Sequence, residues 1–91
     1  MNDAAGTADD HVEGAELRRR ISTIWRDVLN ARDASPDATF LELQGQSISA
    51  VRIVGRIEEE IGIEVDAAIL FEDPDMRTFV DEVVRRAGPA G

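Results

Sequence analysis

The hydroxyl of Ser47 is the group in this sequence that is best placed to react. It follows a flexible Gly45-Gln46 step and opens an apolar-striped segment, so we predict that it starts a helix and projects into solvent. The free N–H groups and the dipole at a helix N-terminus would stabilise a phosphate diester joined to this hydroxyl. Serine is also a common helix N-cap. From the residues alone, Ser47 is therefore either an attachment point or a cap.

Other reactive side chains are scarce. The chain has no cysteine and no lysine, which excludes disulfides, thiolate metal ligands and Schiff-base chemistry. The single histidine, His11, lies in a polar segment ahead of the first apolar stripe. The sequence also lacks a Gly-rich phosphate loop, and we identify no pair of carboxylates in an apolar setting. We therefore predict no catalytic residue, no metal site and no enzymatic activity.

Composition limits the partners of the protein. With 91 residues there is room for one small domain and one core. Nineteen acidic residues against ten arginines give a net charge of −9, which repels nucleic acid and favours docking onto basic partners. No apolar run approaches the length of about 18–20 residues that crosses a membrane, and the first residues lack the features of a secretory signal. We predict a cytoplasmic monomer that binds neither nucleic acid nor membranes.

Apolar periodicity predicts an all-α fold with three main helices and one short helix. We expect them at about residues 13–31, 47–61, 67–71 and 76–87, with Asp75 as the N-cap of the last. The residues that we assign to the core include Leu17, Ile21, Ile24, Trp25, Val28, Leu29, Val51, Ile57, Phe71, Phe79, Val80 and Val83.

A long loop, residues 32–46, separates the first two helices. It carries three large apolar residues, Phe40, Leu41 and Leu43, which should not all face water. We expect the loop to fold back onto the core through Phe40 and Leu43. A loop of this length in a compact domain is usually functional.

The two ends of the chain differ in composition from its middle, and its charges are unevenly distributed. We predict a disordered acidic tail over residues 1–12, a folded domain over 13–88 and a frayed C-terminus over 89–91. Acidic residues crowd residues 57–75, whereas arginines gather in residues 17–32. The acidic run is either a solvated face or a docking surface for basic enzymes.

Three segments at matching spacing resemble the carrier proteins of nonribosomal peptide synthesis. Residues 40–53 read FLELQGQSISAVRI, which is similar to the family signature F-F-x-L-G-G-(D/H)-S-L-x-A-(V/M)-x-L. Residues 24–29 read IWRDVL and resemble the family's first-helix IW..VL, and residues 70–75 read LFEDPD and resemble its LFE.PT element. The resemblance covers about residues 14–87.

This resemblance implies a four-helix, acyl-carrier-like bundle with a 4′-phosphopantetheine arm on Ser47. It also implies a free-standing, type II peptidyl carrier that holds an aminoacyl group as a thioester and presents it in trans. The implied partners are a phosphopantetheinyl transferase, an adenylation enzyme and condensation or tailoring enzymes. The chain departs from the signature at Gln44, Gln46 and Ile48. Because Gln46 replaces the usual charged residue, we expect a transferase of broad specificity.

The resemblance also indicates a partner-binding face beside the modified end of the second helix and on the short third helix. We assign to it Gln46, Ile48, Arg52, Arg56, Ala68 and Ile69. Two alternatives stay open: an acyl or aryl carrier of a polyketide or siderophore pathway, and an unmodified acidic helical adaptor in which Ser47 is only a cap.

Overall fold

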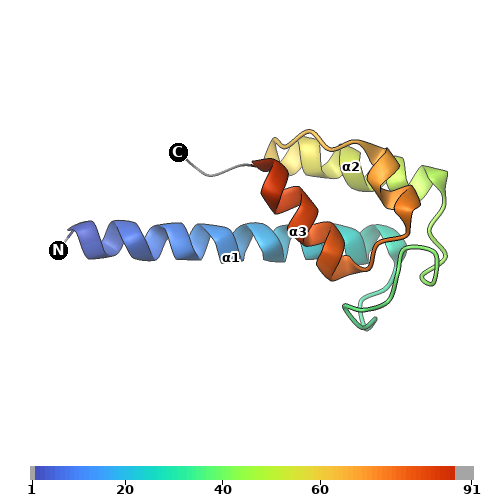
Figure 1. Cartoon of the computed structure of the whole chain (residues 1–91), viewed down its shortest axis with the longest axis horizontal. Coiled ribbons are helices and arrows are strands. Elements are labelled where there is room, and N and C mark those ends of the chain that lie inside the picture. Colours follow the sequence, from blue (N-terminus) through green and yellow to red (C-terminus); the bar gives the residue numbers. More distant parts are fainter. Residues whose placement is uncertain (1, 88–91) are drawn as a thin grey trace.

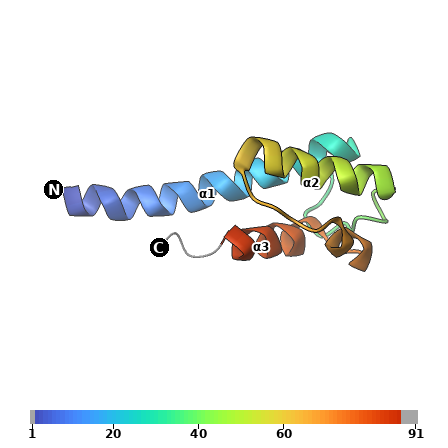
Figure 2. The ribbon, with the colours of Figure 1, turned by 90° about the horizontal axis from the view of Figure 1, so that it is seen from above.

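The computed structural model describes residues 2–87, and these form a small helical bundle (Figures 1 and 2). The elements are α1 (Asn2–Leu29), α2 (Ser47–Ile61), a short 3₁₀ helix η1 (Ala67–Glu72) and α3 (Met76–Ala87). The all-α prediction, with three main helices and one short one, is confirmed. Within this part of the chain, no helix is both long and apolar enough to cross a membrane.

Helix α1 spans Asn2–Leu29, whereas we predicted a helix over about residues 13–31. It begins at Asn2, so the segment that we expected to be a disordered acidic tail continues the helix from residue 2 onward. In both ribbon views this part projects beyond the bundle as a straight extension of α1. The segment contains no proline, and adding turns to an existing helix costs much less than starting one. The extent of the domain itself stays a prediction, and the expected frayed C-terminus, 89–91, lies outside the described residues.

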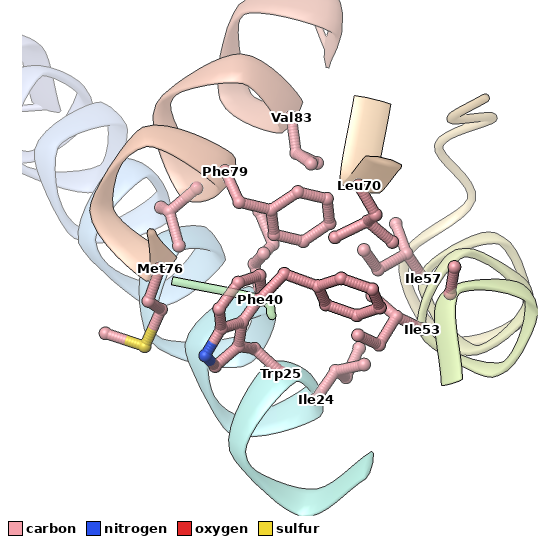
Figure 3. Packing of buried hydrophobic residues seen from close by; sticks show 12 residues of the cluster. Ile24, Trp25, Phe40, Ile53, Ile57, Leu70, Met76, Phe79 and Val83 are labelled. Carbon is pink, nitrogen blue, oxygen red and sulfur yellow. The ribbon is translucent and has the colours of Figure 1, made fainter. Parts of the chain in front are cut away.

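The core lies where α1, α2, η1 and α3 meet. Trp25 is at its centre with 1% of its surface exposed, as predicted, and its ring centroid lies 6.2 Å from that of Phe40 and 5.4 Å from that of Phe79. Figure 3 shows these rings packed, tilted to one another, between α1, α3 and the helices that carry Ile53, Ile57 and Leu70. The buried residues are Ile21, Ile24, Trp25, Phe40, Ala50, Ile53, Ile57, Leu70, Met76, Phe79, Val80 and Val83.

Two residues that we assigned to the core are exposed instead. Val51 is 60% exposed and Phe71 is 55% exposed. On α2 the core side is defined by residues such as Ile53, and Val51 lies about 160° around the helix from it. On η1 the buried residue is Leu70, and each 3₁₀ residue is turned by about 120° from the one before it. Both predictions were wrong because neighbouring apolar residues cannot all face the same side.

The loop between α1 and α2 is pinned to the segment that precedes α3. Phe40 is fully buried, and its N–H donates to the carbonyl of Pro74 at 2.9 Å. The N–H of Leu41 donates to the Asp73 carboxylate at 2.8 Å. Leu43 is partly buried against the core, so the expected anchoring through Phe40 and Leu43 is confirmed.

Helix α3 begins with the predicted N-cap. The N–H of Thr78 donates to Oδ1 of Asp75 at 2.7 Å, and Met76 is the first helical residue. Hydrogen bonds from Thr78, through its side chain and its backbone, lower the pKa of Asp75. The cap therefore keeps its charged form, which also suits the positive end of the helix dipole.

Replacing Trp25 by alanine should remove the centre of the core. We expect a loss of about 3–5 kcal/mol in the free energy of unfolding, out of a total of about 5–15 kcal/mol for a domain of this kind. Urea denaturation followed by circular dichroism measures the change. As a control, Leu41→Ala removes a side chain that is 61% exposed and should change little. A Trp25→Ala protein as stable as this control would contradict the assignment of Trp25 to the core.

Gly45 should tolerate no side chain. A Cβ atom at this position would lie within the Phe40 ring's van der Waals surface, because the loop folds the ring back over the Gly45 backbone. We expect Gly45→Ala to destabilise the protein by about 1–3 kcal/mol through overpacking. Gly14→Ala, where a Cβ meets nothing within 4 Å, is the control in the same denaturation assay and should not destabilise. Equal stability of the two variants would show that Phe40 can move at no cost.

Candidate functional site

Ser47 is the first residue of α2, and it is exposed. The N-cap position belongs to Gln46, which has an extended backbone with φ −133° and ψ 173°. The N–H of Gln46 donates to the hydroxyl of Ser49 at 3.3 Å, so Ser49 contributes to this helix start. Among the described residues, no hydrogen bond uses the Ser47 hydroxyl. The alternative that Ser47 serves as the cap is therefore wrong.

The surroundings of Ser47 suit a covalently attached phosphate. The first turn of α2 contains no acidic residue. The N–H groups of that turn point toward the start of the helix, where the dipole is positive. An exposed hydroxyl without a partner, at an anion-compatible helix end, fits the attachment of a phosphodiester-linked arm.

Four exposed apolar residues surround this helix start: Leu41, Ile48, Val51 and Phe71, which we call the apolar set. Their exposed fractions lie between 55% and 61%. Ile48 and Val51 stand one turn apart on α2, whereas Phe71 comes from η1, which lies beside the first half of α2 in both ribbon views. Leu41 is tied to the end of η1 through its hydrogen bond to Asp73. Three separate segments thus present apolar surface near Ser47.

Sequence reasoning identified only part of this surface. Ile48 was predicted, and Leu41 was expected to flank this surface from the loop, but Val51 and Phe71 were assigned to the core. A helical-wheel count from Ile53 could have placed Val51 on the exposed side. The sequence does not indicate the hydrogen bond of Leu41 to Asp73, which spans 32 residues.

The other predicted partner residues differ in exposure. Gln46, Arg52 and Ala68 are exposed, whereas Ile69 is half-buried against the core. Arg56 is also half-buried, and it pairs with two carboxylates, those of Glu60 at 2.7 Å and Asp27 at 3.5 Å. The hydrogen bond to Glu60, together with Asp27, raises the pKa of Arg56. Arg56 therefore joins α2 to α1.

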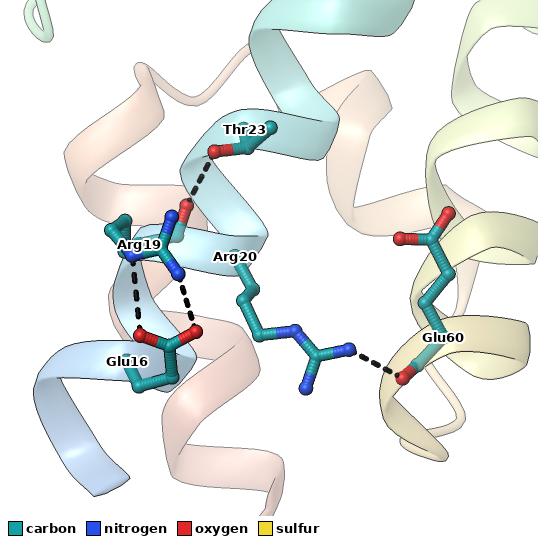
Figure 4. A network of polar contacts seen from close by, with 5 residues as sticks. All are labelled: Glu16, Arg19, Arg20, Thr23 and Glu60. Carbon is teal, nitrogen blue, oxygen red and sulfur yellow. Dashed lines mark hydrogen bonds and ion pairs between the residues drawn. The ribbon is translucent and has the colours of Figure 1, made fainter. Parts of the chain in front are cut away.

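A second arginine contact ties α1 to the far end of α2. Arg20 donates to the backbone carbonyl of Glu60 at 2.9 Å, and Figure 4 shows its side chain reaching across from α1. On the same helix, Arg19 pairs with Glu16, and the hydroxyl of Thr23 donates to the carbonyl of Arg19 at 2.9 Å. Part of the arginine-rich stretch of α1 is thus used to hold the bundle together.

Residues 19–83 match the family described as "Phosphopantetheine attachment site". Among curated proteins, surfactin synthase subunit 1 of Bacillus subtilis is 35% identical over 75 residues, which is 82% of this chain and 2% of that protein. Phosphinothricin tripeptide synthetase PhsB of Streptomyces viridochromogenes is 32% identical over 71 residues, 78% of this chain and 6% of that protein. The chain thus spans only a small fraction of the length of these relatives.

A solved structure agrees with the fold. BlmI, a type-II acyl-carrier-protein from Streptomyces verticillus involved in bleomycin biosynthesis, superposes with a TM-score of 0.68 at 29% sequence identity. The match covers 84% of this chain and 92% of that one. The family match spans more than half of the chain, and the helices and the exposed serine agree with it. The chain belongs to the phosphopantetheine attachment site family, the carrier proteins and carrier domains that hold a covalent 4′-phosphopantetheine.

Proposed function

We propose that this protein carries 4′-phosphopantetheine on Ser47 and presents an aminoacyl or peptidyl group to partner enzymes during nonribosomal peptide biosynthesis. The observation that carries the proposal is the state of the Ser47 hydroxyl, which is exposed at the first residue of α2 while Gln46 and Ser49 form the cap. This supports the proposal, because a hydroxyl without a cap hydrogen bond is open to modification.

In this proposal the arm, the helical bundle and the partner enzymes each make a different contribution. Proteins of this family are generally not catalysts themselves, and they work with adenylation, condensation and other enzymes. The chain has no cysteine, so the bound arm supplies the thiol on which a thioester forms. The bundle contributes the position of Ser47 and a surface that partner enzymes recognise.

We propose that partners dock on the apolar set together with Gln46, Arg52 and Ala68. Leu41, Ile48, Val51 and Phe71 are large apolar side chains with more than half of their surface exposed, and they lie around the reactive hydroxyl. Grouped exposed apolar side chains are typical of interaction sites. We leave Arg56 out of this face, because its guanidinium is already paired with Glu60 and Asp27. Ile69 contributes to it only at its edge, since it is half-buried.

The similarity to BlmI favours a carrier that acts in trans, because the match covers 92% of that type-II protein. The description of BlmI also supports the alternative that this protein is an acyl carrier. BlmI is described as an acyl carrier protein, whereas the relatives named above are peptide synthases. The cargo of this chain is therefore aminoacyl in our first proposal and acyl in the second.

The modification itself is the first test. Incubated with coenzyme A and a phosphopantetheinyl transferase of broad specificity, the protein should gain one arm, which intact mass spectrometry detects. Ser47→Ala should gain none. Ser49→Ala keeps the reactive hydroxyl and should still be modified, although loss of its cap contact should cost about 0.5–2 kcal/mol of stability. An unmodified wild-type protein would exclude the carrier function, and a modified Ser47→Ala would exclude the site.

The two kinds of cargo are separated by loading. The modified protein should form a thioester when it is offered amino acids, ATP and adenylation enzymes, and the added mass identifies the amino acid. Parallel reactions supply acyl-activating enzymes with acyl or aryl substrates. Loading with acyl groups alone would favour the second proposal over the first.

A further inference from the structure

Gln44 has a left-handed backbone conformation, with φ 65°. It ends a turn over residues 40–44, in which the N–H of Gln44 donates to the carbonyl of Leu41 at 2.9 Å and the N–H of Gly45 donates to that of Phe40 at 2.8 Å. These two hydrogen bonds are the pair of a Schellman motif, and the left-handed residue of that motif is usually glycine. The local backbone therefore favours glycine at position 44, where the carrier signature also has glycine.

Two other non-glycine residues of the described chain are left-handed, and each has a local reason. Asn30, with φ 54°, directly follows α1, and asparagine is the common alternative to glycine at a helix end. Asp73, with φ 61°, ends η1, and its carboxylate accepts the N–H of Leu41. Gln44 has neither reason, because its side chain is exposed and makes no hydrogen bond within residues 2–87. Backbone strain without a local compensation is typical of functional positions.

Gln44 contributes to an open hollow of about 760 Å³ between the end of α1 and the end of the loop. Pockets that bind small organic molecules have volumes of about 300–1,000 Å³. Val28 and Leu29 of α1 and Leu43 of the loop line the hollow, and all three also pack against the core. Asn30 lines it as well. The hollow thus combines apolar surface with the side-chain amides of Gln44 and Asn30.

The hollow lies next to the reactive serine. Ser49, in the first turn of α2, also lines it, and Ser49 follows Ser47 by about 3 Å along the helix axis. In both ribbon views the end of α1 and the start of α2 lie at the same end of the bundle (Figures 1 and 2). A group attached to Ser47 is therefore tethered beside the hollow.

The tether decides which ligand such an open site can hold. A short flexible tether gives an effective concentration of about millimolar, so even a weak site is filled. A free small molecule lacks this advantage, and an open hollow would hold it only weakly. The arm on Ser47 is thus the ligand that the position of the hollow favours.

The chemistry of a pantetheine chain matches that of the hollow. The chain alternates secondary amides, which each offer one N–H and one carbonyl, with methylene and methyl groups. The side-chain amide of Gln44 is both a donor and an acceptor, so it is complementary to such an amide. Val28, Leu29 and Leu43 are complementary to the methylene and methyl groups.

We propose that the side-chain amide of Gln44 holds the pantetheine part of the arm in this hollow, as its resting position between encounters with partner enzymes. The inference rests on the proposed function, since it requires modification of Ser47. It explains why the side chain at position 44 is retained against the preference of the backbone for glycine.

Magnetic resonance of isotope-labelled protein tests the inference by comparing the unmodified and the modified forms. Modification with coenzyme A and a transferase of broad specificity should shift the side-chain amide signals of Gln44. It should also shift the backbone signals of Ala31 and Ala34, which line the hollow from the start of the loop. Protein that gains the arm without these shifts would overturn the inference and leave the modification of Ser47 standing. Protein that gains no arm would overturn both.

Two variants separate the side-chain amide of Gln44 from the backbone at this position. Glycine suits the left-handed conformation, so unmodified Gln44→Gly should unfold at a midpoint no lower than that of the wild type. Gln44→Met, the matched control, keeps a long unbranched side chain and the left-handed cost, but it has no amide.

In both modified variants, the ratio of docked to free arm should fall by about two- to tenfold, the effect of one lost hydrogen bond. The shifts at Ala31 and Ala34 should shrink accordingly. Shifts of wild-type size in either variant, or a lowered midpoint of Gln44→Gly, would overturn the inference.

Discussion

The packing of Phe40 into the aromatic core is the contact on which the rest of this structure depends. Phe40 is the fully buried side chain of the long loop, and it lies against Trp25 of α1. Its burial brings the backbone of Gly45 over the ring and fixes the two residues that lead into α2. The position of Ser47 in space is therefore set by a side chain seven residues earlier, in a different element.

The same anchoring shapes the surface around Ser47. Leu41 follows the buried Phe40 and is itself 61% exposed, and Asp73 holds its backbone in place. Asp73 also ends η1, in a left-handed conformation with φ 61°. One short contact thus links the loop to the helix that carries Phe71. The apolar set is exposed because other residues of the same segments fill the core.

Charge has two roles in this protein. Arginines of α1 and α2 hold the helices together through the contacts of Arg20 with Glu60 and of Arg56 with Asp27. These contacts are partly exposed, so each contributes modestly, and their value lies in orienting α2. The remaining acidic residues on α2, such as Glu58 and Glu59, stay exposed and contribute to the net charge of −9, which favours basic partners.

By itself, the sequence determined the number and type of the helices, the burial of Trp25 and the anchoring of the loop, and it indicated Ser47 as the candidate site. Each of these follows from local periodicity, from turn residues or from a motif of adjacent positions. Such patterns can be recognised in the sequence without knowledge of the fold. Only the tertiary structure decided that Val51 and Phe71 face solvent, that Arg56 pairs with α1, and that Gln46 and Ser49 leave the Ser47 hydroxyl free. Burial and pairing depend on which face of each helix meets a distant segment, and that is a property of the packed bundle.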